Sequence, residues 1–222
     1  MEFLSIIKHA PIFAGIDENR LDSVLECLGA KTREYEKNRY ILRSGDSVYS
    51  VGLVLSGAAL IIQEDFWGNR NLLANLSAGQ LFAEAFACSP GSVMNVSVVA
   101  QVDCAVLWLD VKRILTSCPN ACAHHAAVSR NLLSELARKN LKLNEKLTHM
   151  GQRTTRGKLM SYLSAEAERH GAAEFDIPFS RQQLADYLSV ERSAMSAELC
   201  KLRDDGILSF SRNHFRLLSR LD

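Results

Sequence analysis

The chain has 222 residues, of which 47% are hydrophobic, and its formal net charge at pH 7 is +1. A chain of this length and composition can bury enough apolar surface for two modest domains. It contains no apolar run of about eighteen residues and does not start with a basic segment followed by an apolar one. These absences exclude a membrane-spanning helix and a signal segment, so we expect a cytoplasmic protein that does not bind membranes.

Charge is distributed unevenly along the chain. Residues 1–117 carry 10 Lys and Arg against 13 Asp and Glu, whereas residues 118–222 carry 16 against 12. The second half is therefore the better candidate for contact with nucleic acid. Its basic excess is small, so we expect DNA affinity to depend on a localised patch and on dimerisation.

The first expected elements are helices, followed by strands. Residues 5–29 form a helical entry, in which Pro11-Ile12-Phe13 ends one turn and Asp17-Glu18 opens a helix. Short apolar segments then alternate with turns rich in Gly, Ser and Asn, which predicts a compact β-roll or barrel. The predicted strands are Tyr40–Leu42, Ser50–Leu55, Ala58–Gln63, Asn71–Leu76 and Val96–Leu109.

A β-roll that holds a catalytic metal needs inward-facing histidines and a carboxylate. Residues 31–110 contain no histidine. We therefore expect no catalytic residues and no imidazole site for metal or haem in the roll, which disfavours an enzyme. Sensing of a small ligand is the role left for residues 1–117.

Cys118-Pro119-Asn120-Ala121-Cys122, with His124 and His125, is the one arrangement in the sequence that suggests metal binding or redox chemistry. Cysteines four apart at the start of a helix are more often small buried residues. The six scattered cysteines of the chain are expected to remain thiols in a reducing compartment. The sequence leaves open whether these cysteines and histidines sense redox state or bind a metal.

Residues 120–150 contain no Gly or Pro and predict one helix of about thirty residues. Certain positions repeat at alternating spacings of three and four, as in a parallel coiled-coil homodimer, with a polar Asn140 that fixes the register. These positions are Ala126, Ser129, Leu133, Leu136, Asn140, Leu143, Leu147 and Met150. A helix packed on its own roll is the alternative. We assign residues 118–150 to a dimerisation helix that ends at a hinge, Gly151.

Residues 151–222 predict a winged helix-turn-helix domain. A helix over Thr154–His170 comes first. Ser180 and Gln183 then form a capping box at the start of a short helix, and a turn at Ser189-Val190 leads into a second helix. That second helix is the predicted recognition helix, which enters a DNA groove.

The recognition helix is expected to end at Asp205-Gly206, because glycine readily adopts the left-handed conformation of a helix cap. Two alternating segments, Ile207–Phe210 and His214–Leu218, follow it and form a hairpin, the wing. An ordinary helical subdomain with a terminal hairpin is the alternative. The ordered arrival of capping box, turn, second helix and wing favours DNA binding.

The outward face of the recognition helix carries the predicted base contacts. Arg192 matches the O6 and N7 acceptors of guanine, and Ser193 and Ser196 are secondary contacts. Phosphate contacts are expected elsewhere in the domain. They are assigned to the backbone amides of Arg181 and Gln182, and are extended by Lys201, Arg212 and Arg216.

Taken in order, these features resemble the Crp/Fnr family of bacterial transcription regulators over essentially the whole chain. The motifs that carry the resemblance are Pro11–Ile16, Gly45-Asp46, Leu55-Ser56-Gly57, Ser180–Ala185 and Glu191-Arg192-Ser193. The resemblance implies an α+β fold with an amino-terminal double-stranded β-helix (a jelly-roll-like β-roll), a long dimerisation helix and a carboxy-terminal winged helix-turn-helix. It also implies a homodimer on a roughly palindromic DNA site, with half-sites about 34 Å apart.

The resemblance locates the effector site as well. In the family's cyclic-AMP receptor a Gly-Glu pair contacts the ribose, and an Arg-Ser pair neutralises the phosphate. The matching pairs here are Ala83-Glu84 and Met94-Asn95, while Leu143 and Asn144 hold the positions that would meet adenine. Because a thioether offers no charged donors to a phosphate, we expect an effector other than cyclic AMP.

The partners implied are double-stranded DNA, a small effector of unknown identity and, if the protein is an activator, RNA polymerase. Iron-sulfur members of the family carry a cysteine cluster near the amino terminus, and no cysteine precedes Cys27 here. The alternative function is a regulatory module that binds a cyclic nucleotide or another small ligand without acting on DNA. The winged helix at the carboxy terminus opposes it.

Overall fold

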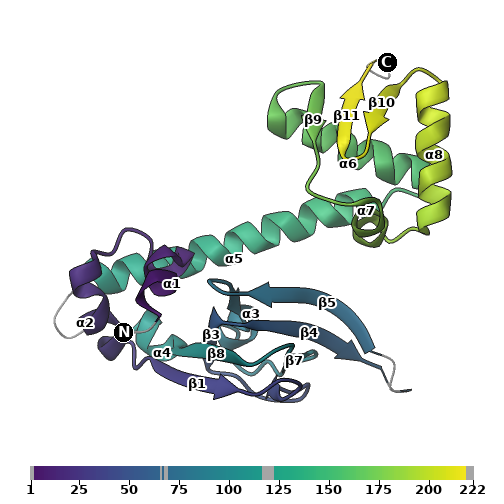
Figure 1. Cartoon of the computed structure of the whole chain (residues 1–222). Coiled ribbons are helices and arrows are strands. Elements are labelled where there is room, and N and C mark those ends of the chain that lie inside the picture. Colours follow the sequence, from purple (N-terminus) through teal and green to yellow (C-terminus); the bar gives the residue numbers. More distant parts are fainter. Residues whose placement is uncertain (1–2, 66, 68–69, 117–122, 219–222) are drawn as a thin grey trace. The chain divides into compact units, whose positions relative to one another are not determined.

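A computed structural model describes residues 3–65, 67, 70–116 and 123–218 (Figure 1). The chain divides into two compact units, Met1–Arg138 and Lys139–Asp222. The long helix α5 (Ala123–Met150) contributes to both of them, close to the length predicted. None of the helices in the described ranges is long and apolar enough to cross a membrane.

The first unit begins with helices, as predicted. They are α1 (Leu4–His9), the 3-10 turn η1 (Pro11–Phe13) and α2 (Glu18–Cys27). Two more short helices, α3 (Glu84–Ala87) and α4 (Val111–Leu115), follow strands later in the unit. Ile12 and Phe13 of η1 and Leu21 of α2 are fully buried in one cluster with Leu132 of α5, so α5 begins against this helical layer.

The described part of the first unit contains two four-stranded antiparallel sheets, the β-roll (Figure 1). One sheet has the order β1 (Lys31–Tyr35), β8 (Cys104–Asp110), β3 (Ser50–Ser56) and β6 (Leu81–Phe82). The other has the order β2 (Tyr40–Leu42), β7 (Ser97–Ala100), β4 (Ala58–Glu64) and β5 (Arg70–Ser77).

One predicted strand is wrong. Val96–Leu109 is not continuous: the chain bends at residues 101–103, and β7 and β8 lie in different sheets. The backbone N–H of Gln101 bonds to the carbonyl of Ala58 (2.9 Å), and the carboxylate of Asp103 accepts a bond from the N–H of Lys37 (2.8 Å). These polar contacts end one strand before the next begins.

Strand β3 shows why the two sheets stack. Val51, Leu53 and Leu55 belong to the cluster that contains the helices, whereas Val54, on the opposite face, belongs to the cluster between the sheets. At Gly52 a Cβ atom would lie 2.3 Å from Cζ of Phe82, so only glycine lets this ring pack against the strand.

The second unit contains the end of α5 and a small helical domain with a sheet. Its elements are α6 (Thr155–His170), β9 (Glu174–Asp176), α7 (Arg181–Leu188), α8 (Arg192–Asp204), β10 (Leu208–Ser211) and β11 (His214–Leu217). The described strands form one antiparallel sheet of order β10-β11-β9. The predicted capping box is confirmed, since the Ser180 hydroxyl and the Gln183 side chain each bond to the other's backbone N–H.

The turn and the wing also follow the prediction. Ser189 ends α7 in a left-handed conformation (φ 51°), and Met195, Leu199 and Leu202 of α8 are buried against the rest of the unit. Gly206 (φ 70°) ends α8, after which β10 and β11 form the hairpin. The structure therefore confirms the predicted α+β architecture of β-roll, long helix and winged helix-turn-helix.

Candidate nucleic-acid interface and effector site

The start of α8 is organised by the carboxylate of Glu191. It accepts a hydrogen bond from the backbone N–H of Ala194 (2.8 Å) and another from the hydroxyl of Ser193. These bonds, with that of Ser193 first, lower the pKa of Glu191. An ionised carboxylate thus caps the helix at the end where the helix dipole favours negative charge.

The outward face of α8 brings the predicted base-contacting residues together. Arg192 and Ser193 are exposed, and Ser196 is half-buried, with its hydroxyl donating to the carbonyl of Arg192 (2.9 Å). The opposite face holds the fully buried Met195 and Leu199. Burial of that apolar face fixes the rotation of α8, so Arg192 points away from the unit's core.

The side chain of Arg181 packs inward on the wing, whereas the phosphate contact predicted for this residue uses its backbone amide. Its guanidinium lies over the rings of Phe210 and Phe215, 4.9 Å from each centroid, and burial lowers its pKa. The side chain therefore holds the wing against α7, which sequence analysis missed because these residues are distant in the chain. The backbone N–H groups of Arg181 and Gln182 lie at the start of α7, where a phosphate contact through them stays a prediction.

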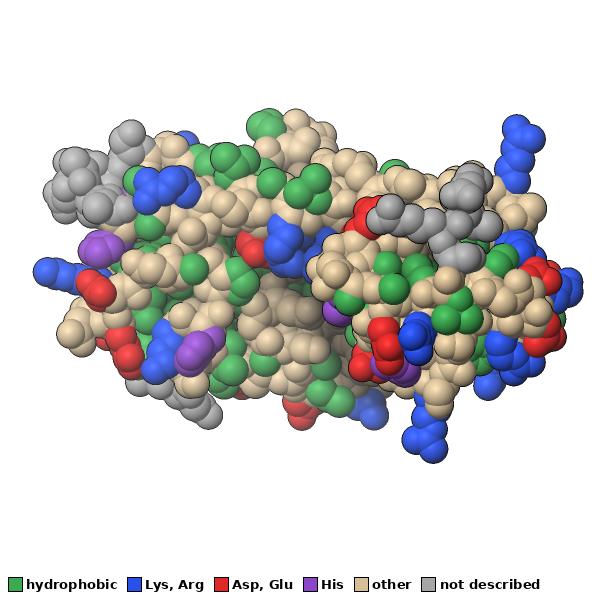
Figure 2. All heavy atoms as spheres, turned by 90° about the horizontal axis from the view of Figure 1, so that it is seen from above, with side chains coloured by type: hydrophobic (Ala, Val, Ile, Leu, Met, Phe, Trp, Pro, Cys, Tyr) green, Lys and Arg blue, Asp and Glu red, His purple; other side chains and the backbone are tan. Residues whose placement is uncertain are grey.

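Two of the other predicted phosphate contacts, Lys201 and Arg216, lie on the surface beside acidic side chains. Lys201 pairs with Glu198 (2.7 Å) and Arg216 lies 3.8 Å from Glu174. Figure 2 shows Lys and Arg side chains interspersed with Asp and Glu, without one continuous basic patch on the face in view. Because exposed ion pairs contribute little, these cations can exchange a carboxylate for a phosphate at small cost.

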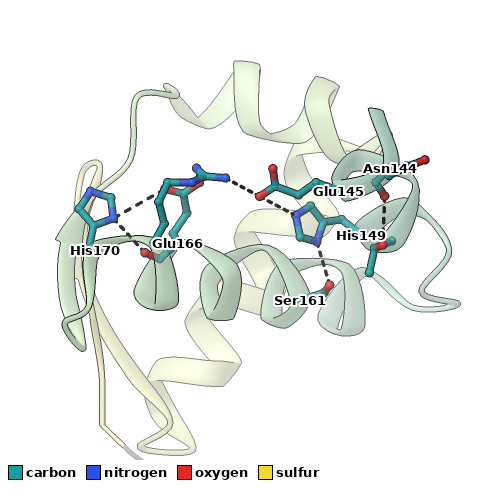
Figure 3. Close-up of polar contacts among 8 residues, drawn as sticks. Asn144, Glu145, His149, Ser161, Glu166 and His170 are labelled. Carbon is teal, nitrogen blue, oxygen red and sulfur yellow. Dashed lines mark hydrogen bonds and ion pairs between the residues drawn. The ribbon is translucent and has the colours of Figure 1, made fainter. Parts of the chain in front are cut away.

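A chain of polar contacts fixes the end of α5 to α6 (Figure 3). His149 is 2% exposed, and its Nδ1 lies 2.8 Å from Oγ of Ser161. Glu145 of α5 pairs with Arg169 of α6, which also pairs with the buried Glu166. Sequence analysis did not identify this cluster. The last two turns of α5 thus belong to the same body as the winged helix.

The predicted effector residues of the first unit occupy two places in the β-roll. Ala83 has a left-handed backbone (φ 62°), and Glu84, which follows it, is only 6% exposed. Arg138 of α5 donates hydrogen bonds to the carboxylate of Glu135, which raise the pKa of Arg138, and Glu84 adds a smaller electrostatic contribution in the same direction.

Met94 contributes to the core of the roll. Its side chain is 2% exposed and packs between the sheets, and its backbone bonds to Gly45 and Asp46. Asn95 next to it is exposed. Leu143 and Asn144, in the second unit, are exposed too, and the Asn144 amide donates to Asn140 (2.9 Å).

Two family models match the chain in the order of its two units. A cyclic nucleotide-binding domain matches residues 32–118, and a Crp-like helix-turn-helix domain matches residues 157–221. The chain belongs to the Crp/Fnr family. It is a DNA-binding transcription regulator, and the family identifies it as a regulator rather than an enzyme.

Known members resemble this Crp/Fnr regulator over most of their length. The transcriptional activator protein FnrL of Cereibacter sphaeroides is 25% identical over 216 residues, which cover 91% of this chain and 82% of the relative. The probable transcriptional regulator flp of Lacticaseibacillus casei is 24% identical, with 96% and 93% covered.

Solved structures share the fold of this regulator. The catabolite activator protein of Thermus thermophilus has a TM-score of 0.51 and 23% identity, with 93% of each chain covered. The c-di-GMP responsive global regulator CLP of Xanthomonas campestris has a TM-score of 0.55 and 18% identity, with 92% of this chain and 100% of that chain covered.

The cysteine and histidine residues around position 120 lie only partly within the described ranges. Cys118 and Cys122 lie outside the described residues. His125 is buried, with Nδ1 3.6 Å from Sγ of Cys27 and Nε2 against the carbonyl of Arg113. Within the described ranges, no three or more His, Cys, Asp or Glu side chains are grouped as metal ligands would be.

Proposed function

We propose that this Crp/Fnr regulator acts as a homodimer that places α8 of each subunit in successive major grooves of a two-fold symmetric DNA site. The observation that carries the proposal is the exposed Arg192 at the start of α8, opposite the buried Met195 and Leu199. A guanidinium in the major groove matches the two acceptors of guanine. Ser193, Ser196 and Lys201 would add base and phosphate contacts around it.

Exposed leucines on α5 support the homodimer. Leu133 and Leu147 are 67% and 56% exposed, and they flank Asn140 at intervals of seven residues. Leu143, 57% exposed, lies between them in the heptad pattern. Ser129 and Leu136, also in the predicted seam, contact the first unit instead, through the carbonyl of Ile114 and the helical cluster. The dimer contact would therefore be made mainly by the later part of the helix.

The effector proposed for the β-roll is a small molecule other than cyclic AMP. The buried thioether of Met94 supports an effector other than cyclic AMP. It packs in the core of the roll, at the position where the cyclic-AMP receptor of the family has an arginine that binds the phosphate. Glu84, beside Ala83, remains the proposed polar contact, with Asn95, Leu143 and Asn144 as further candidates. If the regulator activates transcription, RNA polymerase is a further partner.

Selection from a pool of randomised duplexes with the purified protein tests the proposal. We expect enrichment of a two-fold symmetric site with a guanine in each half, about 34 Å apart. Loss of the guanidinium in Arg192→Ala should cost about 1–3 kcal/mol on this site and relax one base position. Lys201→Ala should weaken binding to all sequences alike. Equal losses for Arg192→Ala on selected and random DNA would contradict the assignment.

A further inference from the structure

The first turn of α8 determines which kind of hydrogen bond each of its side chains can offer to DNA. A serine hydroxyl has one proton to donate and two lone pairs that accept. The proton of the Ser193 hydroxyl is directed to Oε2 of Glu191. What remains of Ser193 for an outside partner is a pair of acceptors.

We propose that Ser193 is a specificity-determining residue that accepts a hydrogen bond from an exocyclic amine, N4 of cytosine or N6 of adenine. The proposal rests on the proposed function, because it requires α8 in a major groove. The new element is that Ser193 accepts rather than donates a hydrogen bond at this base, because Glu191 binds the hydroxyl proton.

The carboxylate of Glu191 is held in the position that this role requires. The same Oε2 atom accepts the backbone N–H of Ala194 at 2.8 Å, which anchors it at the helix start. The two bonds lower the pKa of Glu191, so the group is ionised at neutral pH and has no proton to give. A charge-assisted bond is stronger than one to a neutral base edge, so DNA should not capture the proton of Ser193.

The neighbouring side chains of α8 also present a defined hydrogen-bond polarity. The hydroxyl of Ser196 donates to the carbonyl of Arg192 (2.9 Å), so it too presents acceptors. The guanidinium of Arg192 has only donors. Arg192 therefore suits the O6 and N7 acceptors of guanine, and Ser193 suits a donor on a neighbouring base.

For the DNA site, an acceptor at Ser193 determines which bases are preferred at one position of the strand that Ser193 faces. Every base pair presents one amine in the major groove, on adenine or on cytosine, and a carbonyl oxygen on its partner. A side chain that can only accept prefers adenine or cytosine on the strand that it faces. It disfavours guanine and thymine there.

The test is selection from randomised duplexes with three variants of the full chain. For the unmodified protein we expect adenine or cytosine at one position adjacent to the guanine in each half-site. Ser193→Ala should lose that preference and keep the guanine. Glu191→Gln should admit guanine and thymine, because the glutamine amide can donate to the hydroxyl and release its proton. Ser164→Ala, an exposed serine of α6, is the matched control and should leave the site unchanged.

A second measurement removes the amine from the DNA. A duplex that carries 2-pyrimidinone for cytosine, or purine for adenine, at the selected position should bind about 5- to 10-fold more weakly. Ser193→Ala should show no further loss on that duplex, because the pair is already broken. Guanine or thymine at the selected position, or an unchanged preference in Ser193→Ala, would overturn the assignment while the symmetric site stands. Absence of any symmetric site would refute the proposed function itself, and this assignment with it.

Discussion

Ala83 has a left-handed backbone conformation, which is energetically unfavourable for a residue with a Cβ atom. Its φ of 62° and ψ of 5° lie in the left-handed region, immediately before the buried Glu84. For an L-residue with a Cβ this conformation costs roughly 1–2 kcal/mol, and glycine avoids most of that cost. We expect Ala83→Gly to stabilise the protein by about 1 kcal/mol, measured by denaturant unfolding.

Ala85 provides the control, since it is exposed and lies within α3. Glycine in a helix interior is destabilising relative to alanine, so Ala85→Gly should lower the free energy of unfolding by about 0.5–1 kcal/mol. The two substitutions are chemically identical and should act in opposite directions. A destabilising Ala83→Gly would mean that the conformation there costs no strain.

For single residues, the sequence could predict only contacts and orientations that depend on residues a few positions apart. The capping box of Ser180 and Gln183 joins residues three apart, and the outward face of α8 follows from helical spacing. The packing of Arg181 on Phe210 depends on the path of the chain through α8, so spacing alone could not show it. The buried position of Met94 depends in the same way on how the two sheets stack.

At the scale of elements, the strands that escaped prediction are either polar or very short. β1 is exposed along most of its length and lies at the edge of its sheet, where polar residues are tolerated. β6 has two residues and β9 has three. Apolar alternation needs about four residues to be recognised, so these short strands are defined by their partners rather than by their own sequence.

The joint between α5 and α6 should make the second unit sensitive to pH. Burial lowers the pKa of His149 below its ordinary 6.5, opposed by smaller contributions from Glu145 and Glu166. The unfolded chain therefore binds this proton more tightly than the folded one. Stability should fall as pH drops below about 6.5, by about 1.4 kcal/mol for each unit by which the pKa is lowered. His149→Gln should flatten this part of the pH profile, measured by thermal unfolding.

His214 supplies a control of opposite sign. Hydrogen bonds to Glu174 and then Asp176 raise its pKa, so its contribution is present below pH 6.5 and is lost as pH rises through the folded-state pKa. His214→Gln should therefore remove stability on the acid side, whereas His149→Gln should restore it. If both variants changed the profile in the same direction, burial would not be the cause assigned to His149.

At the scale of the whole molecule, the exposed leucines of α5 are the feature that a single chain does not explain. Leu133, Leu143 and Leu147 of the predicted seam are each more than half exposed, as is Leu141 outside it, whereas Val128, Leu132 and Leu136 pack into the helical cluster of the first unit. Large aliphatic side chains at heptad spacing favour association, because a second helix buries them. Asn140 between them would fix the register of a parallel pair.

The oligomeric state should therefore depend on this stripe. We expect Leu143→Glu combined with Leu147→Glu to convert a dimer into a monomer in sedimentation velocity, because like charges would face each other across the seam. DNA affinity should fall at least tenfold, since one recognition helix then binds without the second. Leu115→Glu, at an exposed leucine of α4, should change neither property. A double variant that stays dimeric would place the interface elsewhere and leave the stripe for another partner.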